Sequence, residues 1–180
     1  VLFWPEYEET RSHATLRRTL SVANSALGKE WLCIDRHAVC LEQREDLYVD
    51  VTQFRSLIKR AVDHSHASAH SCSDCAAWLT TAIELYRDSF LTGFSLKDSA
   101  DFDDWQSRET TRIAQELNYA FDQVTAWHIY NQNFNTAITY AQRWLQQDPL
   151  HETAHYRLMQ LYVWSGQRAA ALQQYADLEM

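Results

Sequence analysis

A helical hairpin pattern occurs twice in the last third of the chain, with a spacing of 34 residues. A shift of this length places Ala137 on Ala171. It also aligns Gln132 with Gly166 in the polar turn between the two helices. Small residues where helices cross let the backbones approach, and larger residues one turn later fill the remaining space. The sequence therefore predicts stacked helical hairpins in this region.

This period is that of the tetratricopeptide repeat. The dipeptide Asp148-Pro149 closes the first unit, because a residue before proline is pushed away from helical dihedrals and proline suits the first turn of the next helix. Two units bury little by themselves, since repeat arrays need about three units for a continuous core. We therefore expect the helices before Leu117, from about Ala76 onward, to belong to the same body.

The composition predicts a folded, mainly helical protein. Of the 180 residues, 46% are hydrophobic and seven are tryptophan, which excludes disorder, and only three glycines and two prolines favour long helices. No apolar run approaches the roughly 20 residues that span a bilayer, so we expect no membrane segment. No stretch of the sequence has the pattern of a signal peptide, so we expect none. The chain begins at Val1 inside an apolar cluster, and we expect it to be a piece of a longer, cytoplasmic protein.

The net charge of −8 is unevenly distributed. Residues 1–63 carry nine Lys and Arg against ten Asp and Glu, whereas residues 64–180 carry seven against fourteen. The acidic repeat region disfavours contact with nucleic acid there. If DNA is bound, the near-neutral first part must bind it.

This first part predicts a helix and a hairpin. Apolar residues recur at helical spacing from about Thr10 to Leu27, and Gly28 follows as a left-handed stop. Two strand-like runs, 31–34 and 38–41, are joined by Asp35-Arg36-His37. The polar face of the helix carries Arg11, His13, Thr15, Arg17, Arg18 and Ser21.

Further helices are expected after this hairpin. Residues 47–51 indicate a strand or extended entry, and Asp50 or Thr52 can cap a helix with Phe54 on its apolar side. We expect a helix from about Ala76 to Phe90, and one long helix, 101–130, as the spine of the domain.

The chain carries an ordered series of motifs: Phe3-Trp4-Pro5, Leu16-Arg17, Ala26-Leu27-Gly28, Val49-Asp50-Val51 with Phe54, Ala82-Ile83-x-Leu85-Tyr86-Arg87, Phe90-Leu91-x-Gly93, Trp105, Arg108-Glu109, Asp148-Pro149-Leu150-x-Glu152, Leu158-Met159, Tyr162, Gly166-Gln167 and Ala171-Leu172-x-x-Tyr175. This series resembles the bacterial transcriptional activator domain, which occurs in the antibiotic regulatory proteins of actinomycetes and in larger activators. The resemblance covers essentially the whole chain.

The resemblance implies the C-terminal part of a winged-helix DNA-binding domain at residues 1–50, followed by a tetratricopeptide-like activator domain at residues 51–180. The recognition helix would be about 10–27 and the wing about 31–41, and the first sheet and helices of the winged helix would precede Val1. The residues expected at DNA are Arg11, His13, Thr15, Arg17, Arg18, Ser21 and Arg36.

The second half of the expected recognition helix departs from the family. Family members often carry several arginines there, whereas this chain has Ser21-Val22-Ala23-Asn24-Ser25. Few cations leave few phosphate contacts and a shallow salt dependence, since each contact adds about 0.9 to the slope. Two hypotheses follow: a DNA-binding transcription regulator, or a protein-interaction scaffold whose winged-helix remnant no longer binds DNA.

A protein partner could bind the groove side of the repeat helices, at Tyr119, Asp122, Tyr156, Gln160 and Trp164. An exposed Trp164 would be an interface anchor. These side chains could instead pack against neighbouring helices. The partner would be RNA polymerase, another protein or a second copy of the chain.

Two further groups of residues remain. One group consists of thiols and imidazoles that suit zinc, at His64, His66, His70, Cys72 and Cys75. A single Cys-x-x-Cys, however, favours a solvated linker or a helix start at Asp74. We therefore expect no metal or other cofactor. Cys33 and Cys40 are expected as two half-buried, reduced thiols. A zinc-dependent sensor is a third hypothesis.

The carboxylates do not predict an enzyme. Without a glycine-rich loop or a nucleophile, they indicate solvated helix faces and first-turn acids, at Glu84, Asp88, Asp101, Asp103, Asp104, Glu109 and Glu116. Arg108 and Arg112 can pair with acids one turn away on the long helix, each pair contributing a few tenths of a kcal/mol.

Overall fold

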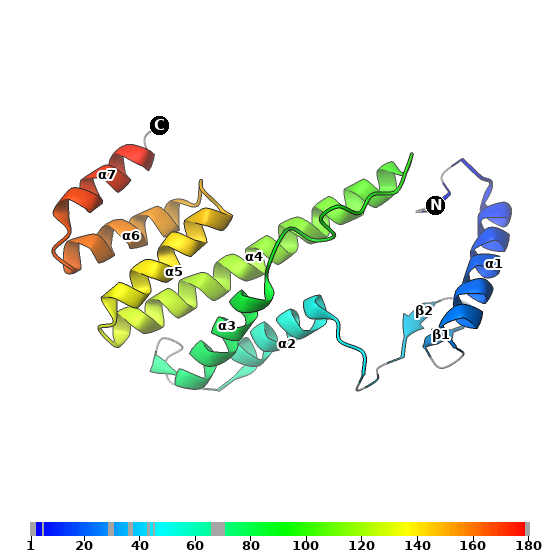
Figure 1. The fold of residues 1–180 in the computed structure, drawn as a ribbon, viewed down its shortest axis with the longest axis horizontal. Helices are drawn as coiled ribbons and strands as arrows, with labels where there is room; N and C mark the ends of the chain where they lie inside the picture. The colour runs from blue at the N-terminus through cyan, green and yellow to red at the C-terminus, as the bar shows by residue number, and fades with distance from the viewer. Residues whose placement is uncertain are drawn as a thin grey trace. The chain divides into compact units, whose positions relative to one another are not determined.

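The computed structural model of the protein describes residues 3–4, 6–28, 31–35, 38–42, 44, 46–65 and 71–178 (Figure 1). These residues form a mainly helical protein with one small antiparallel hairpin, as predicted. Two compact units divide the chain, the first comprising residues 1–49 and 89–110 and the second residues 50–88 and 111–180. None of the described helices is long and apolar enough to cross a membrane.

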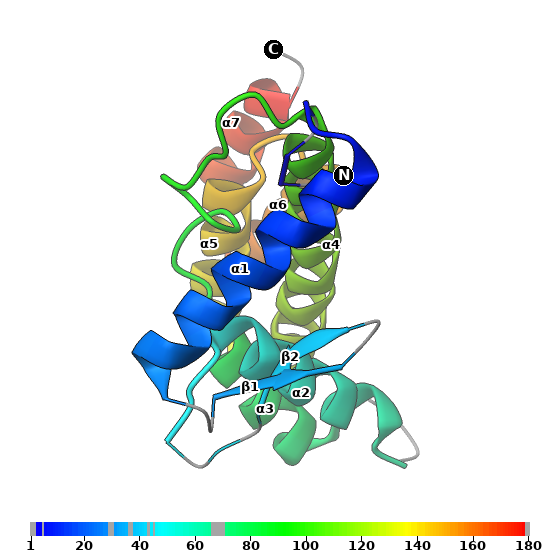
Figure 2. The same cartoon turned by 90° about the vertical axis from the view of Figure 1, so that its right-hand side faces the viewer.

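The first unit contains helix α1 (Glu9–Leu27) and the strands β1 (Leu32–Ile34) and β2 (Val39–Leu41), which Figure 2 shows side by side in the hairpin. Gly28, with a φ of 92°, ends the helix in the left-handed region, as its sequence position predicts. The hairpin register pairs Cys33 with Cys40. The Asp35 carboxylate accepts a hydrogen bond from the Ala38 amide at 2.7 Å and so fixes the turn.

A buried serine connects the beginning of α1 to the segment before it. The Ser12 side chain is fully buried, and its hydroxyl lies 3.4 Å from the carbonyl oxygens of both Trp4 and Tyr7. The sequence pattern did not single this residue out. It sets the angle at which the preceding segment enters the helix.

The first unit also contains a loop folded onto the first turns of α4 (Ala100–Tyr130). The Phe90 ring meets Trp105 edge-on at 5.5 Å, and Gln106 donates a hydrogen bond to the Phe90 carbonyl oxygen at 3.1 Å. Phe102 is buried in the same aromatic cluster. This packing explains one wrong prediction: the helix expected to reach Phe90 ends at Leu85, because Phe90 packs against α4 instead.

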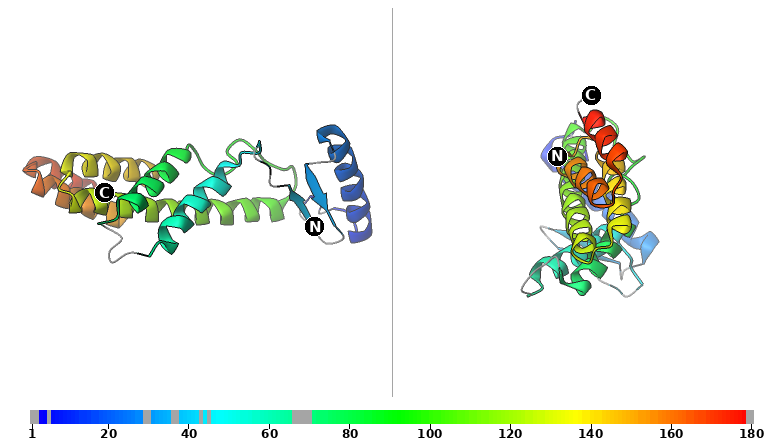
Figure 3. Two further views of the ribbon diagram at one scale, coloured as in Figure 1. Left: turned by 90° about the horizontal axis from the view of Figure 1, so that it is seen from below. Right: turned by 90° about the vertical axis from the view of Figure 1, so that its left-hand side faces the viewer.

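The second unit is a set of helical hairpins (Figures 1 and 3). Helix α2 packs against α3, α5 against α6, and α6 against α7. The 31-residue helix α4, predicted as 101–130, is continuous. The remaining helices are α2 (Asp50–Asp63), α3 (Ser73–Leu85), α5 (Phe134–Gln147), α6 (Glu152–Trp164) and α7 (Arg168–Leu178).

Small residues fill the helix crossings of this unit, as the repeat pattern predicts. Ala137 and Ala141 of α5 and Ala154 of α6 are completely buried. Ala137 and Ala141 share a core cluster with Leu158 and Leu161 of α6. Close approach of the backbones at these alanines produces the hairpin stack.

Candidate functional sites

The polar face of α1 is exposed to solvent. The side chains of His13, Arg17, Arg18 and Ser21 are exposed, and Thr15 is half-buried. Arg11 is also exposed, but its guanidinium lies over the Tyr7 ring at 4.0 Å, which fixes its position. Arg36, the remaining residue of the expected DNA-binding set, lies outside the described residues.

Helical geometry divides these side chains between two sides of α1. Arg11, Thr15 and Arg18 follow one another at spacings of four and three residues on one side, and His13, Arg17 and Ser21 at spacings of four on the other. His13 and Arg17 border a groove of about 290 Å³ between α1 and the hairpin. The apolar floor of this groove includes Leu16, Leu20, Ile34 and Val39. Leu16 and Leu20 are thus only half-buried in the described structure.

The proposed partner residues lie on α4 and α6. The Tyr156 and Trp164 side chains are 56% and 49% exposed, so both offer aromatic surface to solvent. Gln160 donates a hydrogen bond to the Tyr156 hydroxyl at 2.8 Å, which aligns the two side chains along α6. Trp164 also contacts the Phe134 ring of α5, with centroids 6.1 Å apart.

Asp122 lies beside an arginine that the sequence analysis missed. The Arg157 guanidinium donates to the Asp122 carboxylate at 3.3 Å, and both side chains are about 29% exposed. This ion pair connects α4 with α6. The 34-residue period relates α4 to α6 as corresponding helices of successive units, but it does not predict which of their side chains meet. Tyr119 is at the border of the exposed surface, and burial raises the pKa of its phenol.

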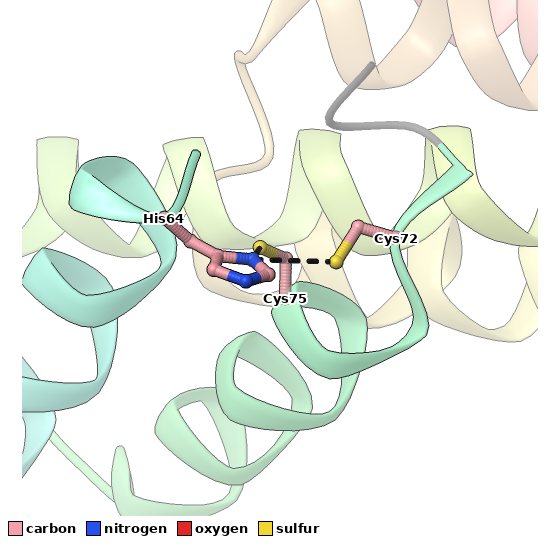
Figure 4. Close-up of side chains that lie close together, drawn as sticks. All are labelled: His64, Cys72 and Cys75. Atoms are coloured by element: carbon pink, nitrogen blue, oxygen red, sulfur yellow. Dashed lines mark hydrogen bonds between the residues drawn. The ribbon is translucent and has the colours of Figure 1, made fainter. Parts of the chain in front are cut away.

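His64, Cys72 and Cys75 lie together between α2 and α3 (Figure 4). The Nδ1 atom of His64 lies 3.3 Å from the Cys75 Sγ and 3.5 Å from the Cys72 Sγ. Cys75 is buried, and burial together with the neighbouring Cys72 raises its pKa to about 11, so the thiol is neutral at pH 7 when no metal is bound. His66 and His70 lie outside the described residues.

The other two cysteines are exposed, which corrects the expectation of half-buried thiols. Cys33 and Cys40 face each other across the hairpin, whose residues are mostly exposed, so little packs over their sulfurs. Both thiols are free, as predicted. The Cys40 thiol donates to the Cys33 carbonyl oxygen at 3.6 Å, and Cys40 raises the pKa of Cys33.

Several acidic residues form ion pairs that connect helices. Glu116 of α4 accepts from Arg55 of α2 at 3.0 Å and lies 3.8 Å from Arg112, one turn away on its own helix. Glu84 of α3 pairs with Arg143 of α5 at 2.6 Å. These contacts give Glu84 and Glu116 a structural role.

Helices α2 to α7 lie in the part of the sequence that matches a known family. The sequence model of the bacterial transcriptional activator domain matches residues 49–180, which is more than half of the chain. The chain belongs to the bacterial transcriptional activator domain family. No curated protein matches the sequence. The matched region of this bacterial transcriptional activator domain contains Tyr156, Trp164 and the His64 cluster, whereas α1 and the hairpin precede it. Membership places the chain among domains of transcription regulators and activators.

Proposed function

We propose that the chain is part of a DNA-binding transcription activator of the cytoplasm, in which residues 1–50 contribute DNA contacts and residues 51–180 contact another protein. Family membership supports the regulatory role. The observation that carries the DNA-binding part is the exposed polar face of α1. Within the part of the chain that the structure describes, an aromatic ring stacks on Arg11 but not on Arg17 or Arg18. In the proposed complex, α1 acts as a recognition helix and the β1–β2 hairpin as a wing.

The charged and the uncharged polar side chains of α1 have different roles in this proposal. Arg17 and Arg18 contact the DNA phosphates on either side of the DNA groove that the helix enters. These contacts position the helix but do not read the base sequence. His13, Thr15 and Ser21 carry the donors and acceptors that can reach base edges. Since cations are few, affinity depends strongly on each one.

The proposal is tested by measuring DNA affinity of the full-length protein at several salt concentrations. Replacing both Arg17 and Arg18 by alanine should weaken binding to specific and random duplex alike, and should reduce the slope of log affinity against log salt by about 2. Arg168→Ala, an exposed arginine of α7, is the matched control and should leave both quantities unchanged. An absence of binding by the unsubstituted protein even at low salt would reject the DNA-binding role.

The second candidate function is a protein-interaction scaffold that does not bind DNA. It is favoured by the run 21–25, which contains no cation, and by the exposed Tyr156 and Trp164. Aromatic side chains of this size commonly dominate protein interfaces. Under both proposals the partner is RNA polymerase, another protein or a second copy of the chain. The two differ in whether the arginines of α1 are needed.

A further inference from the structure

Three potential metal ligands converge where α2 and α3 meet. His64 directly follows the last residue of α2, Cys72 directly precedes α3, and Cys75 lies in the first turn of α3 (Figure 4). Their ligand atoms, one nitrogen and two sulfurs, all lie within 4.8 Å of one another. Cys72 stands at the N-cap but makes no side-chain capping hydrogen bond, so its sulfur is available to His64. We propose that His64, Cys72 and Cys75 bind a zinc ion.

The two nitrogen–sulfur distances agree with tetrahedral zinc. Zn–S bonds of about 2.3 Å and Zn–N bonds of about 2.0–2.1 Å at tetrahedral angles place a nitrogen about 3.5 Å from a sulfur. The two observed distances from the His64 Nδ1, 3.3 Å and 3.5 Å, lie within about 0.2 Å of that value. The same geometry places two sulfurs about 3.8 Å apart. Because the Cys72 and Cys75 sulfurs lie within 4.8 Å of each other, they would close by up to about 1 Å around the ion.

The chemistry of the donors favours zinc over calcium or magnesium. Thiolates and imidazoles are soft to intermediate ligands that zinc accepts, whereas hard cations require oxygen ligands. Zinc binding displaces one proton from each thiol, and the resulting two thiolates balance the charge of Zn²⁺. The ion and its two thiolates together carry no net charge, which suits the buried position of Cys75. Three protein ligands leave the fourth tetrahedral position for a water molecule or another donor.

The surroundings hold the ligands in place. The His64 ring packs edge-on against Trp78, with centroids 5.2 Å apart. In the metal-free chain the Cys75 thiol donates a hydrogen bond to the Ala61 carbonyl oxygen at 3.6 Å, and this bond is lost when zinc displaces the thiol proton. The Arg60 guanidinium covers the Trp78 ring at 4.1 Å. A bound zinc ion would fasten the end of α2 to the start of α3 at the point where their connection leaves the helices.

The site is tested with the reduced, chelator-stripped chain and Zn²⁺ or Co²⁺ as the probe. The expected results are one zinc ion per chain and, with cobalt, the charge-transfer absorption of thiolate ligands together with the visible bands of tetrahedral coordination. Cys72→Ser and His64→Phe should weaken zinc binding at least about 100-fold, since even residues that only support ligands contribute 10–100-fold. His64→Phe keeps an aromatic ring against Trp78, and both positions are half-buried, so folding should survive and is checked by circular dichroism.

The second cysteine pair supplies the matched control. Cys33→Ser/Cys40→Ser removes the exposed thiols of the hairpin and should leave the stoichiometry and the cobalt spectrum unchanged. The proposal is overturned if the wild-type chain gives no cobalt–thiolate band, if Cys72→Ser binds zinc as tightly as wild type, or if the Cys33/Cys40 variant loses the metal.

Discussion

Gln132 and Gly166 occupy the same left-handed position in the turns of two successive helical hairpins, with φ values of 59° and 77°. The hydrogen bonds around them are also repeated. The Asn133 amide donates to the His128 carbonyl at 2.8 Å, and the Gln167 amide donates to the Tyr162 carbonyl at 2.7 Å. The 34-residue period of the sequence is therefore a period of backbone conformation, in which one turn carries glycine and the other does not.

Substitutions at these two turns should have opposite effects on stability. Gly166→Ala should lower the free energy of unfolding by about 1 kcal/mol, because a Cβ is disfavoured at positive φ and the surrounding space is open, so only the backbone term acts. Gln132→Gly should leave stability unchanged or raise it by up to about 1 kcal/mol, since relief of left-handed strain outweighs the added chain entropy. Urea denaturation of both variants provides the measurement, and a loss of stability in Gln132→Gly would contradict this account.

The buried hydrogen bond between Trp144 and Asn118 should contribute to the free energy of unfolding. The Trp144 indole is 1% exposed, stacks on Phe121 with centroids 6.2 Å apart, and donates to the Asn118 side-chain oxygen at 2.8 Å. Asn118→Ala leaves this indole N–H without its acceptor, so the free energy of unfolding should fall by about 1–3 kcal/mol. In a Trp144→Phe background the same substitution should cost clearly less. Equal costs in the two backgrounds would show that the hydrogen bond contributes nothing.

Acid should destabilise the second unit through His128. Burial lowers the pKa of this imidazole, and its Nδ1 atom is buried without a hydrogen-bond partner among the described residues. Above pH of about 6.5, the ordinary histidine pKa, the imidazole is neutral in both folded and unfolded chains and contributes no pH dependence. As pH falls below that value the unfolded chain binds a proton first, so the free energy of unfolding decreases until the lower folded pKa is reached.

His128→Phe should reduce this acid sensitivity. Phenylalanine can keep the stacking on Tyr140, whose ring lies 5.3 Å from that of His128, but cannot take up a proton. Comparing the unfolding free energies of the two proteins at several pH values isolates the contribution of His128. An unchanged difference between pH 5 and pH 8 would contradict the assignment.

The sequence predicted those features that depend on periodicity. The repeat register, the alanines at helix crossings, the stop at Gly28 and the extent of α4 all follow from local spacing, and the structure contains them. The end of α3 was placed wrongly because the contact of Phe90 with Trp105 outweighs its helical spacing. Tertiary contacts of this kind leave no periodic signal.

Two features of the candidate sites depend on tertiary packing, which the sequence alone does not show. The pair between Asp122 and Arg157 depends on how two helices face each other. The cluster of His64 with Cys72 and Cys75 depends on the packing of α2 against α3, whereas the sequence alone favoured a solvated linker. The proposed zinc site rests on these side-chain positions.

The central claim, that α1 contacts DNA while α6 contacts a protein, is tested most directly by measuring promoter occupancy and transcription in the same cells expressing the full-length protein. The account predicts that Arg17→Ala/Arg18→Ala lowers both occupancy and transcription. It predicts that Tyr156→Ala/Trp164→Ala, which removes the exposed rings of α6, lowers transcription and leaves occupancy at the wild-type level. Normal occupancy in the arginine variant together with a loss of transcription confined to the aromatic variant would contradict the claim and favour a scaffold that does not bind DNA.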